Sequence, residues 1–343
     1  MLPWLVITAD RSDAGRGVRG HALVWFLRTY FGRRRVGCVT PEELRRKPRT
    51  AETVLLGLPS SLPPEEINSL IAATHCRRLV LFDYLDQQEL AWSPEQEPVL
   101  RGLTDRYLKP WFEPACNYGL RMGLLPIRRY GRFTLAVTLD HWLGKIRSPP
   151  VKEYDVAFLG RPNYTRLWVD GKVRLIDQRF QWIRDLKRNA PDLRFWGGLV
   201  EVDPQQRAAL ESQHGDISDL LHTESKVNFA TYYGAMRKSR VLLAPGGNVP
   251  WTYRHYECLY AGGVVVTIDY RQRDMLIPLP REGMVHVPDG ASVAPYVREA
   301  LELSRERPSL PAENIAHLER YLRHSAYSSS RPTLIDRFTA QLI

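Results

Sequence analysis

Two short apolar runs, separated by a Pro-Gly-Gly turn and a helical segment, constrain this chain more than any other feature. The stretch covers residues 237–267 and reads RKSRVLLAPGGNVPWTYRHYECLYAGGVVVT. Its apolar runs, Val241–Leu243 and Val264–Val266, have the character of buried strands. A helix between two such strands predicts a parallel βαβ unit. The turn after the first strand then opens at the carboxyl edge of the sheet, where ligands of open α/β sheets bind.

The turn and the helix carry groups suited to a phosphorylated ligand. Gly246 and Gly247 let backbone N–H groups approach a phosphate, and the following helix N-terminus adds partial positive charge. Arg254 and Glu257 are three residues apart and share a helix face. We expect Arg254 near the phosphates and Glu257 as the acceptor for a ribose diol. The alternative is a plain βαβ crossover without a nucleotide, in which the two side chains form a solvated ion pair.

This order of elements resembles the donor-binding segment of GT-B glycosyltransferases, particularly the exostosin-like and spore-protein-type families. The corresponding elements here are Ala244–Gly247, Arg254, Glu257, Ala261–Gly262 and Val264–Val266. The resemblance implies two Rossmann-like domains facing a central cleft, a nucleotide-sugar donor as co-substrate, and no other cofactor. Many retaining members carry an acidic residue eight positions before the ribose-binding one, where this chain has Val249. Asn248 is the predicted substitute for that hexose contact.

The rest of the chain fits an α/β fold of two Rossmann-like domains. A length of 343 residues suits two domains of ordinary size, and strand-like and helical runs alternate in both halves. The predicted parts are an N-terminal acceptor-side domain with linker (1–150), a nucleotide-sugar-binding domain (151–330) and a terminal helix that crosses back to the first domain (331–343). Within the second domain the pattern predicts a strand over 154–160, a long amphipathic helix over 172–189 and a short strand over 193–196.

Two further glycine turns follow predicted strands of the second domain and are candidate donor contacts. Gly160 ends the first strand, and Arg161 or Arg166 is placed to neutralise a diphosphate leaving group. Gly197 ends the next strand and resembles the turn that frames the nucleotide base in GT-B enzymes. Each turn also has a purely structural interpretation, because glycine commonly permits a tight turn after a strand.

The loop after the first predicted strand carries two competing signals. Residues 15–20, GRGVRG, match the dinucleotide fingerprint, which makes an NAD(P)-dependent oxidoreductase an alternative function. Residues 36–40 lack the acidic residue that such sites place at the end of the second strand. In GT-B glycosyltransferases a glycine-rich loop at this position faces the donor phosphates. We therefore predict the general base of an inverting reaction among Asp13, His21 and Asp10, with Asp13 first.

No metal ion is expected in the reaction. The segment Asp83–Asp86, a further candidate source of the base, is not an Asp-x-Asp metal motif, and the four cysteines are scattered without a CxxC pair. Stabilisation of the leaving group is instead expected from Arg254, Arg161 and the Gly246–Gly247 turn.

The charge of the chain is concentrated in its first half. The formal net charge is +10, and residues 1–150 hold 22 Lys and Arg against 15 Asp and Glu. We expect this half to attract a glycan or lipid-linked acceptor and an anionic membrane surface. No nucleic-acid partner is expected, because Arg33–Arg35 and Arg45–Lys47 are short clusters outside any nucleic-acid motif, although a basic non-enzymatic binding protein remains the third alternative. Without a leader or a long apolar segment, a cytoplasmic protein is expected.

Overall fold

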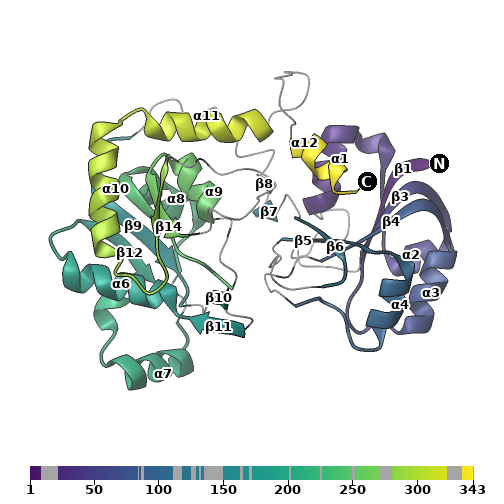
Figure 1. Cartoon of the computed structure of the whole chain (residues 1–343), viewed down its shortest axis with the longest axis horizontal. Helices are drawn as coiled ribbons and strands as arrows, with labels where there is room; N and C mark the ends of the chain where they lie inside the picture. The colour runs from purple at the N-terminus through teal and green to yellow at the C-terminus, as the bar shows by residue number, and fades with distance from the viewer. Residues whose placement is uncertain are drawn as a thin grey trace. The chain divides into compact units, whose positions relative to one another are not determined.

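The computed structural model divides the chain into two compact units, each built on a parallel sheet (Figure 1). Unit 1 comprises Met1–Lys145, Met275–Ile277 and Arg320–Ile343, and unit 2 comprises Ile146–Asp274 and Pro278–Glu319. The residues that the structure describes are 1–8, 22–83, 85, 89–110, 118–124, 129–130, 133–134, 150–162, 165–169, 172–200, 202–224, 226–248, 252, 254–269, 280, 282–322 and 334–342.

Unit 1 contains a six-stranded parallel sheet in the order β2-β1-β3-β4-β5-β6. Its strands are β1 (Leu2–Thr8), β2 (Val36–Val39), β3 (Arg49–Gly57), β4 (Thr74–Phe82), β5 (Arg106–Lys109) and β6 (Arg121–Leu124). Its helices include α1 (Ala22–Phe31), η2 (Arg33–Arg35), α2 (Pro41–Arg46), α3 (Pro64–Ala72) and α4 (Gln96–Leu103). The chain passes from β1 to β2 on one side and then to β3 on the other. The switch point of this sheet therefore lies between β1 and β3.

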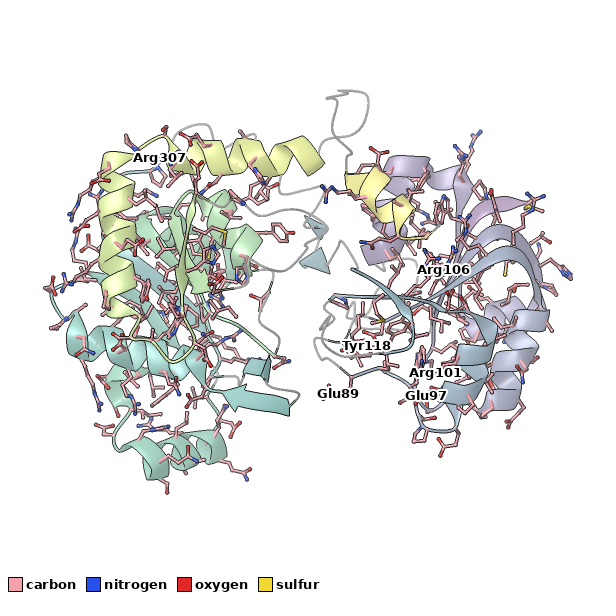
Figure 2. All side chains as sticks on the ribbon, viewed as in Figure 1. Glu89, Glu97, Arg101, Arg106, Tyr118 and Arg307 are labelled. Carbon is pink, nitrogen blue, oxygen red and sulfur yellow. The ribbon has the colours of Figure 1, made fainter. Side chains whose placement is uncertain are left out.

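Side-chain contacts tie the later segments of unit 1 to its sheet and first helix. Helix α12 (Leu334–Ala340) lies beside α1, where Phe26 and Phe338 pack edge to face at 5.1 Å (Figure 1). The guanidinium of Arg106 donates to the carbonyl of Leu342. Arg101 on α4 donates to the carbonyl of Tyr118 at 2.6 Å (Figure 2). The terminal helix thus extends the same folded unit as the first 145 residues.

Unit 2 contains a five-stranded parallel sheet in the order β12-β9-β13-β14-β15. Its strands are β9 (Tyr154–Gly160), β12 (Phe195–Leu199), β13 (Ser239–Ala244), β14 (Val264–Ile268) and β15 (Met284–Val287). Its helices include α6 (Gln178–Asn189), α7 (Pro204–His214), η3 (Ser218–Leu220), α8 (Phe229–Arg237), α9 (Arg254–Ala261), α10 (Ala294–Glu306) and α11 (Leu310–Leu322). The chain goes from β9 to β12 on one side and to β13 on the other, so the switch point lies between β9 and β13.

The predicted α/β class with two parallel sheets is confirmed, but one predicted helix is wrong in its first part. Residues 172–176 form β11 (Lys172–Ile176), the antiparallel partner of β10 (Thr165–Val169), and α6 begins only at Gln178. In KVRLI, Val173 and Leu175 alternate with polar residues, which is the period of a strand, and TRLWV ends in a short apolar run. A second hairpin, β7 (Arg129–Tyr130) with β8 (Phe133–Thr134), occupies part of the predicted linker. Within the described part of the chain, no helix has the length and apolarity needed to cross a bilayer.

Candidate functional site

The candidate site lies at the switch point of the unit 2 sheet, where the loops after β9 and β13 begin. Two side chains from the first turn of α6 hold these loops. Arg179 Nε donates to the carbonyl of Gly246 at 2.8 Å, and its Nη1 donates to the carbonyl of Arg161 at 3.1 Å. Gln178 Oε1 accepts the N–H of Gly246 at 2.8 Å. The two loops are therefore fixed to each other through α6.

These contacts change the role expected for the Pro-Gly-Gly turn. The N–H of Gly246 already bonds Gln178, so it is not the phosphate donor that the sequence suggested. A Cβ at Gly247 would lie 2.9 Å from Arg179 Nη2, so glycine at this position gives the guanidinium room. Sequence analysis missed Arg179 because a helix over 172–189 would put it well inside the helix rather than in the first turn beside the sheet edge.

A chain of hydrogen bonds connects the two predicted residues of α9. Arg254 Nη1 donates to the hydroxyl of Tyr232 at 3.2 Å, and this hydroxyl donates to Glu257 Oε2 at 2.9 Å. Glu257 is only 2% exposed, and its Oε1 is buried without a hydrogen-bond partner among the described residues. A buried carboxylate oxygen without a donor is costly, and a ligand hydroxyl bound there removes that cost.

Arg254 links this chain of hydrogen bonds to the end of β9. Its guanidinium carbon lies 4.6 Å from the ring centroid of Phe158 and 5.7 Å from that of Tyr232. A Cβ at Gly160 would lie 3.0 Å from Arg254 Nη2. The structure thus brings Gly160, Arg254 and Glu257 together, as their separate motifs in the sequence suggested. Tyr232 comes from α8, and no local pattern in the sequence connects it with α9.

Two buried side chains of α9, His255 and Cys258, pack this helix against the sheet. His255 is fully buried, with Nδ1 2.8 Å from the carbonyl of Thr252 and Nε2 2.8 Å from Thr267 Oγ1. Burial lowers the pKa of His255 to about 3, so the ring is neutral at physiological pH. Burial also raises the pKa of the Cys258 thiol, which makes it a packing group rather than a nucleophile.

Gly197 does not form the turn that the sequence suggested. It lies inside β12, paired with Phe158 on β9, and has φ of 108°. A Cβ at this position would overlap the carbonyl oxygen of Phe158. Its conformation and the close approach of two strand backbones therefore explain this glycine without a ligand.

The other predicted site residues differ in what the structure describes. Arg161 and Asn248 are exposed and lie in the loops after β9 and β13. Asp13, His21 and Asp10 lie outside the described residues. Among the residues that are described, no group of three or more His, Cys, Asp or Glu side chains is placed to hold a metal ion.

Asp83, the other carboxylate considered as a base, is engaged within unit 1. Its Oδ1 accepts the N–H of Leu85 at 2.9 Å, and its Oδ2 accepts bonds from the Tyr107 hydroxyl and from Lys109 Nζ, the latter at 3.4 Å. Burial raises the pKa of Asp83, against the opposing charge of Lys109. Asp83 follows β4 and therefore lies away from the switch point of its sheet.

Comparison with known proteins identifies the fold. No family model matches the chain, and no curated protein matches it. An alpha-glucosyltransferase solved in complex with UDP and a 13-mer DNA is similar, with 11% identity, 98% of each chain covered and a TM-score of 0.58. The N-terminal domain of Candida albicans trehalose-6-phosphate phosphatase is also similar, with 9% identity, coverage of 99% of this chain and 96% of that one, and a TM-score of 0.53. The two Rossmann-like units of this chain are therefore those of the GT-B fold.

Proposed function

We propose that the protein is a glycosyltransferase that moves a sugar from a nucleotide-sugar donor to a cell-surface glycan or glycolipid acceptor in the cytoplasm. The observation that carries the proposal is Glu257. One oxygen of its buried carboxylate accepts a hydrogen bond from Tyr232, and the other has no partner among the described residues. Glu257 and Tyr232 lie in the same unit as the Pro-Gly-Gly turn. A ribose diol supplies the hydroxyl donor that the second carboxylate oxygen lacks. The similar alpha-glucosyltransferase, which was solved with UDP, supports the same class of reaction.

The donor is proposed to lie along the carboxyl ends of β9 and β13. Arg254 and Arg161 face the diphosphate and stabilise the charge that develops on it as the bond to the anomeric carbon breaks. Asn248 contacts the hexose, and Arg179 acts as a positioning residue by holding the carbonyls of both loops. These cations take the place of a metal ion, so the reaction is proposed to be metal-independent.

The acceptor is proposed to bind unit 1. Asp13, His21 and Asp10 follow β1, one of the two strands at the switch point of its sheet. In an inverting reaction, one of these groups takes the proton of the acceptor hydroxyl. The hydroxyl oxygen then bonds to the anomeric carbon, and the nucleoside diphosphate departs with the electron pair of the broken bond.

The test is a panel of sugar nucleotides, nucleoside diphosphates, NAD and NADP, measured by thermal shift and by release of nucleoside phosphates. Water replaces the acceptor slowly, so the correct donor is hydrolysed without knowledge of the acceptor. We expect one nucleoside diphosphate and its sugar derivative to raise the melting temperature, since a ligand at a hundred times its Kd stabilises the folded state by about 2.7 kcal/mol. Stabilisation by NAD or NADP, without a response to any nucleoside diphosphate, would overturn the proposal.

A further inference from the structure

Seven exposed cations gather at the amino edge of the unit 1 sheet. They come from three separate stretches of sequence, namely Arg33–Arg35, Arg46–Arg49 (Arg46, Lys47, Arg49) and Arg77. The strands β2, β1, β3 and β4 are parallel neighbours, so their first residues lie at one edge. Adjacent strands are about 4.8 Å apart, which puts the outer two of the four about 15 Å apart.

The strand register places Arg35 and Arg77 at the same height along the sheet, and Arg49 three residues, about 10 Å, further toward the amino end. Trp4 on β1 pairs with Val36 on one side and with Thr53 on the other, and Thr53 pairs with Arg78 on β4. Arg35 comes one residue before Val36, and Arg77 comes one residue before Arg78. Arg35 and Arg77 therefore lie at the same height along the sheet. Arg49 begins β3, and Lys47 is two residues before it.

None of the seven side chains forms an ion pair or a side-chain hydrogen bond within the described part of the chain. Among the neighbouring acids, Glu52 is exposed on β3 and forms no ion pair with a described residue, whereas Glu66 is bound by Arg45 at 2.9 Å. The positive charge of this surface is therefore largely uncompensated by the protein itself.

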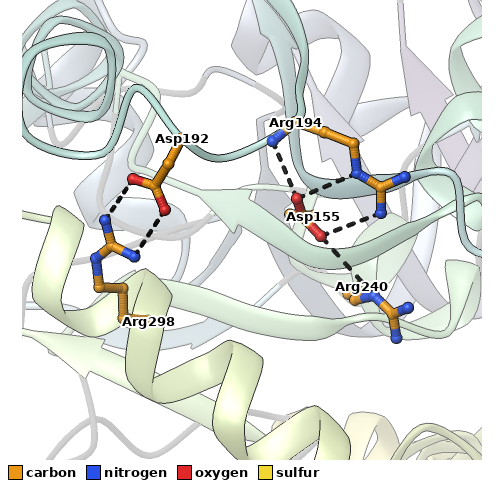
Figure 3. A network of polar contacts seen from close by, with 5 residues as sticks. All are labelled: Asp155, Asp192, Arg194, Arg240 and Arg298. Atoms are coloured by element: carbon orange, nitrogen blue, oxygen red, sulfur yellow. Dashed lines mark hydrogen bonds and ion pairs between the residues drawn. The ribbon is translucent and has the colours of Figure 1, made fainter.

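The amino edge of the unit 2 sheet provides a control within the same molecule. There Lys238 pairs with Glu153 at 2.9 Å, and Asp155 at the start of β9 pairs with Arg194 at 3.3 Å and with Arg240 at 3.9 Å (Figure 3). A parallel sheet of this fold thus does not require unpaired cations at its amino edge. Among the described residues, the amino edges of the two sheets therefore differ in whether their cations are paired.

We infer that this basic edge, formed by Arg33–Arg35, Arg46, Lys47, Arg49 and Arg77, docks on the anionic headgroups of a lipid bilayer. Four to eight clustered cations are enough for such binding, and each contributes through attraction to the negative surface potential. A single-stranded nucleic acid fits less well, because its bases need exposed rings on which to stack. The rings beside this edge, Trp4 and Phe31, pack on each other at 4.9 Å, and Trp4 is buried. The inference does not depend on the proposed function.

Vesicle cosedimentation of the full chain tests the inference. The vesicles contain phosphatidylcholine alone or phosphatidylcholine mixed with phosphatidylglycerol, and the test variant is Arg33→Gln/Arg34→Gln/Arg35→Gln. We expect the parent to bind only the mixed vesicles, more weakly as salt is added. The variant should lose affinity on the order of a hundredfold, from three contributions of about fivefold each. Its melting temperature should not change, because these side chains have no partner among the described residues to lose.

The matched control is Arg194→Gln/Lys238→Gln/Arg240→Gln, which removes the same charge from the amino edge of unit 2. It should retain most of the vesicle binding. Equal binding to neutral vesicles, or equal losses in both triple variants, would overturn the inference. So would binding to duplex DNA that is tighter than vesicle binding and is abolished by the Arg33–Arg35 variant. If a triple variant fails to fold, the inference is tested with the single variants Arg34→Gln and Lys47→Gln and with a salt titration of the parent. Vesicle binding that changes with neither substitution nor with salt would contradict docking by charge.

Discussion

Both units place a carboxylate, a tyrosine hydroxyl and a cation together, with the carboxylate and the tyrosine buried in each case. The two clusters differ in whether the second carboxylate oxygen has a hydrogen-bond donor. In unit 1, Asp83 accepts bonds on both carboxylate oxygens, from Leu85 on one and from Tyr107 and Lys109 on the other. In unit 2, Tyr232 connects Arg254 to one oxygen of Glu257, while the second oxygen has no partner among the described residues. The first cluster is complete within the protein, and the second leaves an acceptor for a ligand.

The positions of the clusters support the same distinction. The unit 2 cluster involves Arg254, which lies beside Gly160 at the switch point between β9 and β13. The unit 1 cluster joins the ends of β4 and β5, away from the switch point between β1 and β3. Open α/β sheets bind ligands at their switch points. We therefore interpret Asp83–Tyr107–Lys109 as a structural cross-link and Arg254–Tyr232–Glu257 as part of the donor site.

The largest expected effect is a loss of stability in unit 1. Replacing Asp83 by Ala leaves the fully buried Lys109 without its carboxylate, which should lower the free energy of unfolding of this unit by about 3–5 kcal/mol. Urea denaturation followed by hydrogen exchange of unit 1 peptides measures the loss. The double variant Asp83→Leu/Lys109→Met should recover much of it, because it removes both charges. Weakened donor binding with unchanged stability would instead give Asp83 a role in the site.

The next largest effect is expected on turnover. Arg254→Ala removes a cation from the proposed diphosphate site and should raise the barrier by about 3–4 kcal/mol, which is a loss of a hundredfold or more in donor hydrolysis. Turnover of the parent should survive excess EDTA. Arg188→Ala, an exposed change on α6, is the control for a general loss of charge. Abolition by EDTA with rescue by Mg²⁺ would contradict the metal-independent mechanism.

Glu257 should behave in the opposite way to Asp83. Glu257→Ala should weaken nucleotide binding by about 1–3 kcal/mol, because ribose hydroxyls are left unpaired in a buried site. Without nucleotide its free energy of unfolding should change much less than that of Asp83→Ala, since the parent already leaves one carboxylate oxygen unsatisfied among the described residues. Isothermal calorimetry with the nucleotide from the donor screen measures the first quantity. Unchanged affinity would remove Glu257 from the ribose site.

The sequence predicted those parts of the site that depend on local spacing. The strand, turn and helix of residues 237–267 are continuous in sequence, so their order was predicted, and the structure connects Arg254 and Glu257 through Tyr232. Tyr232 and Arg179 were missed because each reaches the site from another helix, and their contacts exist only after the sheet has formed. The segment that forms β11 was assigned to a helix for a similar reason, since a strand pairing is specified by its partner.

The stability of unit 2 should depend on pH through the buried His255, an effect of intermediate size. Burial lowers the pKa of His255 from 6.5 to about 3, so between these values the unfolded chain binds a proton that the folded chain does not. The contribution of His255 to the stability of unit 2 is therefore fully present above pH 6.5 and falls by about 1.4 kcal/mol per pH unit below it. Urea denaturation monitored on α9 and β14 peptides at several pH values should show this slope, and His255→Gln should reduce it. Equal slopes in parent and variant would show that another group controls the acid transition.

The smallest expected effects come from a matched pair of tyrosines and bear most directly on the comparison. Tyr107→Phe removes a hydrogen bond to Asp83 and should lower the free energy of unfolding of unit 1 by about 1 kcal/mol, with no change in nucleotide affinity. Tyr232→Phe removes the hydroxyl between Arg254 and Glu257 and should weaken nucleotide binding by about fivefold, the equivalent of about 1 kcal/mol. Both tyrosines are buried, and burial raises the pKa of Tyr107, so the hydroxyl removed from unit 1 is neutral. If Tyr232→Phe lowers stability but leaves nucleotide affinity unchanged, then the unit 2 cluster is a structural cross-link like that of unit 1, and the donor must bind elsewhere.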